Sequence, residues 1–233
     1  MVKILEIVPS TNDYIKENMD SMSHGDCVLA LTQTGGKGRL GRVWESRRGE
    51  SLCFSMLIDV NKWEELTIIP LLCGLASLDT IGVGGLKWPN DIIIGDKKVG
   101  GILCECRGKR AVCGIGINLS QKEDFFRELP NGASLDMMGI PHYEAGVMAI
   151  RLRDNMLKYL NILNLDGKSG IISRFRSRCI TLGCEVEATG SGTVIRGIAS
   201  DINEDGELII DTGSGLVPVN SGEVRLRTKR GYM

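Results

Sequence analysis

Residues 33–44 of this chain read QTGGKGRLGRVW, and this stretch is the strongest guide to the kind of protein that the chain forms. Positions 35–42 combine four glycines with three cations. Glycine permits positive φ angles and close backbone approach, so such a loop can present N–H groups and cationic side chains to a phosphate together. The alternative is a basic surface loop without a ligand. In either case the glycine content predicts a mobile segment over residues 35–44.

The same stretch contains a G-x-G-x-x-G pattern at positions 36–41, but its surroundings do not fit a dinucleotide fingerprint. That fingerprint needs a strand before it, a helix after it and an acidic residue about 20 positions further on. Residues 42–50 are polar and show no helical spacing of apolar residues. The P-loop pattern is also absent. We therefore interpret the match as accidental.

Three further segments place polar residues beside glycines. Residues 87–91 read KWPND, a proline turn holding Asn and Asp, and residues 98–105 read KVGGILCE. Residues 114–119 read GIGINL, in which glycines alternate with branched apolar residues. Glycine inside a strand weakens it and often marks the close approach of a ligand or another backbone. A polar hairpin turn with a surface lysine, and a thin strand through a tight core, are the alternative interpretations.

Hydrophobic periodicity and turn residues predict the elements around these segments. Ser10 or Thr11 is the expected N-cap of the first helix. Strands are expected over 4–8, 27–32, 51–58, 86–88, 92–94, 99–105 and 111–119, and further helices over 66–81, 143–163 and 171–178. After about Gly183 the pattern changes to short strands separated by glycine turns, which is typical of a small barrel. These strands are expected over 194–198, 208–210, 216–219 and 224–226.

Composition excludes several classes of protein. The chain has 233 residues and a formal net charge of -1, so no global positive field holds nucleic acid. No apolar run approaches the ~18 residues of a membrane span, and the first residues lack the apolar core of a secretion signal. These features predict a cytoplasmic protein.

The eight cysteines are expected to be reduced and to pack as small hydrophobic residues. Cys104 and Cys106 form the closest pair, and Cys113 is a possible third ligand for a metal ion. A zinc site usually has four protein ligands, and no convincing fourth ligand is evident. The spacing therefore disfavours a metal–cysteine site.

Taken together and in this order, the segments resemble the biotin protein ligases. The resemblance rests on residues 10–12 (STN), 36–44, 87–91, 98–103 and 116–118 (GIN), and it extends to residues 222–227 (GEVRLR) near the C-terminus. Lys37 is a departure, since the family usually has Arg there, and lysine supplies a point charge without a bidentate fork. The chain begins directly at the catalytic domain, so it resembles the monofunctional members, and DNA binding is not expected.

The resemblance implies an α+β fold. A mixed or antiparallel sheet of the biotin/lipoate ligase type would form a catalytic domain over residues 1–183, and residues 184–233 would form a small SH3-like β-barrel. The implied reaction joins biotin to ATP as biotinyl-5′-AMP, with Mg²⁺, and then transfers biotin to a lysine of a biotin carboxyl carrier protein or domain. A homodimer is also expected.

The resemblance also implies roles for individual residues. Lys98, Arg39 and Asp91 would be catalytic, with Asp91 either holding Mg²⁺ or helping to deprotonate the incoming lysine. Biotin would contact Ser10, Thr11, Asn12, Gln33, Gly36, Arg39, Lys98, Gly100, Gly101 and Gly116. ATP and the adenylate would contact Lys37, Arg39, Arg42, Trp44, Asn90, Lys98 and Asn118, with the indole of Trp44 stacked on adenine.

Two other functions compete with this interpretation. Lipoate ligases and octanoyltransferases share the broad catalytic fold but use a different acid. A non-catalytic module that binds RNA or a carrier protein would need only the small barrel and one basic loop, and it would show salt-sensitive polyanion binding without ATP turnover.

Overall fold

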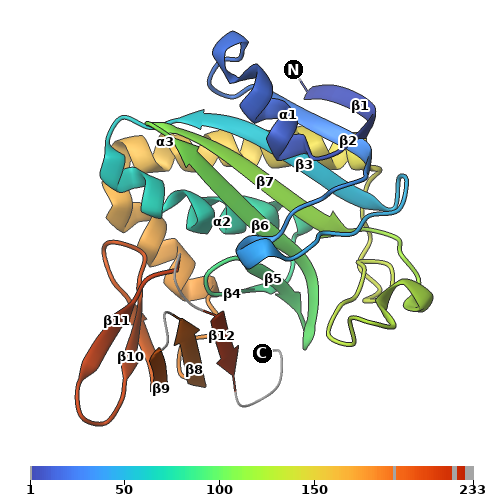
Figure 1. Ribbon diagram of the computed structural model, residues 1–233. Coiled ribbons are helices and arrows are strands. Elements are labelled where there is room, and N and C mark those ends of the chain that lie inside the picture. Colours follow the sequence, from blue (N-terminus) through green and yellow to red (C-terminus); the bar gives the residue numbers. More distant parts are fainter. Residues whose placement is uncertain (1, 191–192, 222–224, 229–233) are drawn as a thin grey trace.

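Two β-sheets, three α-helices and the loops between them make up the described part of the chain, which covers residues 2–190, 193–221 and 225–228 of a computed structural model (Figure 1). The larger sheet has seven strands in the order β1-β2-β3-β7-β6-β5-β4. Their bounds are β1 Val2–Val8, β2 Cys27–Gln33, β3 Ser51–Asp59, β4 Gly85–Lys87, β5 Asp91–Ile94, β6 Lys97–Arg107 and β7 Arg110–Asn118.

The larger sheet is mixed, as predicted. Strands β1 and β2 run parallel, and every other neighbouring pair is antiparallel. The parallel pair is joined by helix α1 (Thr11–Asn18), which begins at the N-cap Ser10, whose side chain accepts a hydrogen bond from the Asp13 backbone N–H. The cap satisfies one of the N–H groups that a helix start leaves without an intrahelical partner, so this boundary was readable from the sequence.

Helices cover both faces of the larger sheet (Figure 1). On one face Ile15 of α1 packs with Val28, Leu57 and Val112. On the other face lie α2 (Ile69–Ile81) and α3 (Ala145–Arg178), which pack against each other and against the central strands in the main hydrophobic core. Helix α2 is buried along almost its whole length, which explains why it is apolar on all sides.

Helix α3 consists of two helical segments that meet at Gly167. Two helices were expected, over 143–163 and 171–178, and the backbone of α3 is non-helical at Gly167, where φ is 69° and ψ is -167°. Glycine adopts this conformation without steric cost, so a helix can bend there and resume.

The smaller sheet has five strands in the order β11-β10-β9-β8-β12. Their bounds are β8 Glu185–Gly190, β9 Thr193–Ile202, β10 Leu208–Asp211, β11 Leu216–Val219 and β12 Arg225–Thr228. Strand β8 was not predicted from the sequence, because only Val186 and Ala188 of this strand are buried and the apolar signal is correspondingly weak. The strand predicted over 224–226 begins at residue 224, which lies outside the described residues.

The predicted SH3-like barrel is not confirmed. Strands β11 and β12 form the two edges of the smaller sheet, and no pairing between them closes it in the residues that the structure describes. The C-terminal sheet therefore remains open in this part of the chain.

The two sheets are connected through Trp88, which is 1% exposed. Its indole Nε1 donates to the carbonyl of Gly206 in the β9–β10 turn over 2.9 Å, and its backbone N–H donates to Thr181 Oγ1 over 2.9 Å. Trp88 thus anchors the KWPND turn to the C-terminal part of the chain. Among the described helices, none has the length and apolar character needed to cross a bilayer.

Candidate active site

A cavity of about 550 Å³ opens on the α1 side of the larger sheet. Its walls come from the start of α1, the end of β2, the loop after β2, the KWPND turn and strands β6 and β7. Most of the predicted site residues line it: Ser10, Thr11, Asn12, Gln33, Lys37, Arg39, Arg42, Trp44, Asn90, Asp91, Lys98, Gly101 and Gly116. The folded chain thus brings together residues from four segments that are far apart in the sequence.

Glycines form the floor of this cavity. Gly101 of β6 and Gly116 of β7 are direct partners in the strand register, and the Trp44 indole lies over them. A Cβ at position 116 would lie 2.4 Å from Trp44 Cε2, and one at position 101 would lie 3.7 Å from Cζ3 of the same ring. Position 116 therefore needs glycine to leave room for the ring above the sheet, whereas the distance at position 101 is an ordinary van der Waals contact.

Charged side chains gather at one end of the cavity. Lys98 Nζ lies 2.5 Å from Asp91 Oδ1, and both side chains are largely shielded from solvent. Lys87, only 5% exposed, also lines this end, and burial lowers the pKa of its ammonium group. The Lys98 ammonium would lie 3.4 Å from a Cβ at Gly101, so the glycine floor extends beneath it.

Arg39 reaches this charged end from the glycine-rich loop. Its Nη1 donates to Asn90 Oδ1 over 2.9 Å, and its Nη2 donates to the carbonyl of Ser221, which follows β11. Asn90 in turn donates through Nδ2 to the carbonyl of Ile102 over 3.0 Å. One guanidinium thus connects the loop, the KWPND turn and the C-terminal sheet, and burial lowers the pKa of Arg39.

A hydrogen-bonded network of neutral polar groups lies at another part of the cavity wall, at the start of α1. Gln33 Oε1 accepts from both the backbone N–H and the hydroxyl of Thr11, over 2.8 and 3.0 Å. The hydroxyl of Ser55 lies 2.6 Å from Thr11 Oγ1 and 2.6 Å from Asn12 Oδ1. Asn12 also donates to the carbonyl of Leu103. Interlocked bonds of this kind hold donors and acceptors in fixed positions.

The glycine-rich loop folds back on itself. An isolated bridge pairs Lys37 with Val43, and the backbone N–H of Trp44 donates to the carbonyl of Gly36 over 2.9 Å. A Cβ at Gly36 would lie 2.2 Å from the Trp44 carbonyl, so this contact requires glycine. Leu40 adopts a left-handed φ of 56°, which is unusual for a residue with a side chain. The mobility predicted for residues 35–44 stays a prediction.

Comparison with known proteins identifies this arrangement. The biotin/lipoate A/B protein ligase family matches residues 4–121, and the biotin protein ligase C-terminal domain matches residues 181–227. The chain belongs to the biotin/lipoate A/B protein ligase family. The family match covers the start of α1, the glycine-rich loop, the KWPND turn and the glycine-floored strands, so it includes every part of the cavity wall named above.

Individual relatives agree with this assignment. The chain is 32% identical to the biotin--[acetyl-CoA-carboxylase] ligase of Mycobacterium tuberculosis, over 86% of this chain and 78% of the relative. It is 28% identical to the bifunctional ligase/repressor BirA of Salmonella typhimurium, over 97% and 74%. The structure of the Aquifex aeolicus biotin protein ligase in complex with biotin and ATP superposes with a TM-score of 0.87, at 30% identity, and covers 98% of this chain and 99% of that one.

Three of the expected site residues do not line the cavity. Asn118 is buried, donates to the carbonyl of Ala133 and accepts from Gln121, so its side chain holds the loop after β7. At Gly100 a Cβ would lie 2.7 Å from the Gly116 carbonyl, which indicates strand packing. Gly36 shapes the loop through its contact with Trp44. None of the three is among the residues that line the cavity, and their contacts with biotin or nucleotide stay predictions.

The fold also brings residues into the cavity wall that were not predicted there. Lys87 of the KWPND turn had no predicted role, although a charged side chain just before a turn rich in polar residues was a usable signal. Ser55 gave no signal of a role in the site, because a serine can occur within an apolar strand for many reasons besides ligand binding. Asn131 lines the cavity from a loop that carries no motif.

Proposed function

We propose that this chain activates biotin with ATP, forming biotinyl-5′-AMP, and then transfers biotin to a lysine of a biotin carboxyl carrier protein or domain. One observation carries the proposal. A single cavity joins a cationic end, at Lys98 and Arg39, to a glycine floor and a network of neutral polar groups. The order of these three environments along the cavity fits a ligand with a carboxylate at one end, an apolar body in the middle and a neutral hydrogen-bonding group at the other end.

In the first half-reaction a biotin carboxylate oxygen attacks the α-phosphorus of ATP, and the bond to pyrophosphate breaks. Negative charge builds on the phosphate oxygens during this step. Lys98, Arg39 and Arg42 line the cavity where their charges can stabilise it, and positioned cations in a shielded site are more effective than ions in water. The glycine-rich loop covers the same place, so it would keep water from the reactive anhydride.

In the second half-reaction the amine of a carrier lysine attacks the acyl carbon, the bond to AMP breaks and the amine loses a proton. Asp91 is a cavity-lining carboxylate that lies beside Lys98, so it is the acidic group with access to that proton. Its contact with Lys98 also holds that ammonium in place. No covalent protein intermediate is needed in either step.

Biotin would lie on the glycine floor. Its cyclic urea has an acceptor oxygen and N–H donors, which fit the hydroxyl and amide groups of Thr11, Gln33 and Asn12 and the hydroxyl of Ser10. The bicyclic ring would use the space over Gly101 and Gly116 after the Trp44 indole, which lies there in this structure, moves to stack on adenine. Trp44 would stack on adenine, and its indole Nε1 is buried without a hydrogen-bond partner among the described residues, so a ligand acceptor would satisfy it. Lys37 contributes a half-exposed charge, which is paired with Asp13 at 2.7 Å.

A magnesium ion is part of the proposal. Mg²⁺ typically takes one or two carboxylates and otherwise binds substrate phosphates and water. Asp91, in the role that is the alternative to accepting the lysine proton, would fit that requirement as a single carboxylate at the cationic end of the cavity. When bound, the ion would neutralise phosphate charge, and the residues of this chain would orient the reacting groups.

Two further properties stay within the proposal. A homodimer is supported by strand β1, an edge strand of the larger sheet on which Ile4 and Ile7 are exposed at 57% and 64%. The carrier protein and the cytoplasmic location are also part of the proposal.

The deciding experiment is exchange of labelled pyrophosphate into ATP by the purified chain with Mg²⁺. We expect exchange with biotin and none with lipoate or octanoate. Exchange with lipoate or octanoate would instead indicate a ligase for that acid. No exchange with any acid would contradict the adenylation step and favour a binding module.

A further inference from the structure

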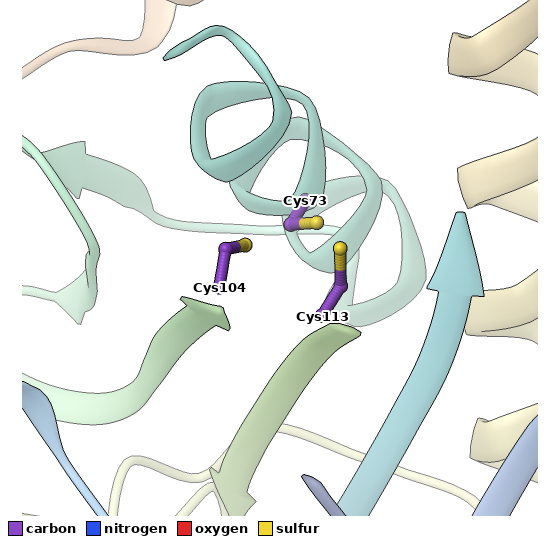
Figure 2. A group of neighbouring side chains, drawn as sticks. All are labelled: Cys73, Cys104 and Cys113. Carbon is purple, nitrogen blue, oxygen red and sulfur yellow. The ribbon is translucent and has the colours of Figure 1, made fainter. Parts of the chain in front are cut away.

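Three cysteines that are distant in the sequence meet behind the floor of the cavity. Cys73 comes from α2, Cys104 from β6 and Cys113 from β7 (Figure 2). Their Sγ atoms all lie within 4.8 Å of one another. All three are free thiols. The sequence analysis considered Cys104 and Cys113 but had no means of adding Cys73, which only the packing of α2 on the sheet supplies.

The cluster lies on the opposite face of the sheet from the cavity. Cys104 and Cys113 are direct partners in the register of β6 and β7. Their neighbours Leu103 and Gly114 line the cavity, and successive side chains of a strand point to opposite faces. Figure 2 shows the two thiols directed toward the helix that carries Cys73. The cluster is therefore separate from the proposed adenylation site.

We propose that Cys73, Cys104 and Cys113 form a binding site for a soft monovalent metal ion, Cu(I). This proposal does not rest on the ligase function. Three sulfurs that are at most 4.8 Å apart all lie within about 2.8 Å of a common point, which is close to the ~2.3 Å of a zinc–thiolate bond. Side-chain adjustments of a few tenths of an ångström would complete the coordination.

The number and kind of ligands select the ion. Soft thiolate ligands favour Cu(I), Zn²⁺ and iron–sulfur clusters. Structural zinc sites have four protein ligands, and three-ligand zinc sites complete their shell with water. Within residues 2–190, 193–221 and 225–228, no fourth His, Cys, Asp or Glu joins this group, and Cys73 and Cys113 have no exposed surface. Three sulfurs in a closed, apolar setting suit a three-coordinate Cu(I) ion.

Metal binding would convert the three thiols into thiolates, because thiolate is the form that binds metal. Cu(I) would displace the thiol protons that its ligands still carry, and these would pass to solvent. Cys104 keeps some exposed surface, which gives the ion a way in.

The test is anaerobic titration of the full chain with Cu(I) in competition with the chelator bathocuproine disulfonate. We expect one tightly bound Cu(I) per chain, and X-ray absorption that shows three sulfur ligands. Cys73→Ala and Cys104→Ala should each weaken binding at least ~100-fold, since even changes to groups around metal ligands commonly cost 10–100-fold. Cys106→Ser is the matched control, because Cys106 is on the same strand, is exposed and is not part of the cluster.

Equal affinity in the wild type, Cys73→Ala and Cys104→Ala would overturn the proposal and leave the three thiols as packing groups. Tighter binding of Zn²⁺ than Cu(I) would overturn the choice of ion. Circular dichroism would show whether Cys73→Ala folds. If it does not, the Cu(I) affinity of Cys104→Ala and the number of sulfur ligands in the wild-type complex still test the three-cysteine site. Two or fewer sulfur ligands in that complex would contradict the three-cysteine site.

Discussion

The indole of Trp44 lies directly over Gly116, and a Cβ at position 116 would be 2.4 Å from the indole Cε2. The glycine-rich loop therefore packs on strand β7 through the Trp44 indole, because Gly116 has no side chain to block it. We expect Gly116→Val to displace the indole, and overpacking of this kind costs about 1–3 kcal/mol. Calorimetric titration should show weaker binding of biotin and ATP. Gly146→Ala is the control, since a Cβ there meets open space, and an equal effect of both variants would contradict this role.

Lys98→Ala should abolish biotin-dependent pyrophosphate exchange. The variant removes the ammonium group that lies 2.5 Å from Asp91 and leaves that shielded carboxylate without this partner. Lys97→Ala removes the neighbouring lysine, whose Nζ donates to the Pro130 carbonyl at the surface, and it should keep nearly full exchange. Near-normal exchange by Lys98→Ala would remove Lys98 from the reaction.

Arg39→Ala should weaken both biotin and nucleotide binding by about 2 kcal/mol, because hydrogen bonds to charged groups contribute roughly 1.5–3 kcal/mol. Arg39→Lys should recover only part of this, since one ammonium cannot reproduce a planar fork that contacts both Asn90 and Ser221. Isothermal titration measures both affinities. Arg48→Ala, at an exposed pair with Glu6, serves as the control. Titration curves for Arg39→Ala that match the wild type would exclude Arg39 from the site.

Trp88→Phe should destabilise the fold. The substitution removes the indole donor to the Gly206 carbonyl and leaves that acceptor without its partner, at a cost of about 1–3 kcal/mol. Urea unfolding gives the change in the free energy of unfolding. Trp63→Phe is the matched control, because Trp63 is 57% exposed. Similar stabilities of the two variants would show that the Trp88 anchor contributes little.

The burial of Lys87 predicts a pH dependence of stability. Burial lowers the pKa of Lys87 below its ordinary value of 10.5 in the folded chain. The unfolded chain therefore binds more protons at this group just below pH 10.5, so the free energy of unfolding rises with pH there. Lys87→Met should lose this rise. Urea unfolding gives the free energy of unfolding of the wild type and of Lys87→Met at each pH. If the two free energies change with pH in parallel, the burial of Lys87 does not cause the rise.

Some features of this protein are determined by short stretches of its sequence. The N-cap at Ser10 and the exclusion of a dinucleotide fingerprint at 36–41 depend only on neighbours in the chain. The linked motifs around Arg39, Asn90 and Lys98 also indicated the family, because their order along the chain can be read without coordinates. Local chemistry and spacing are sufficient for inferences of this kind.

Other features depended on the tertiary structure, because they require contacts between segments whose separation the sequence does not specify. The motif places Asn118 at the end of β7, but only the structure shows that its side chain donates to the Ala133 carbonyl and accepts from Gln121, and its contact with the nucleotide stays a prediction. Ser55 of β3 contacts Thr11 only because α1 packs on the sheet, and Cys73 contacts Cys104 and Cys113 only because α2 packs on the opposite face of the sheet. The register of the strands and the docking of helices arise from packing over the whole core, so no local pattern predicts them.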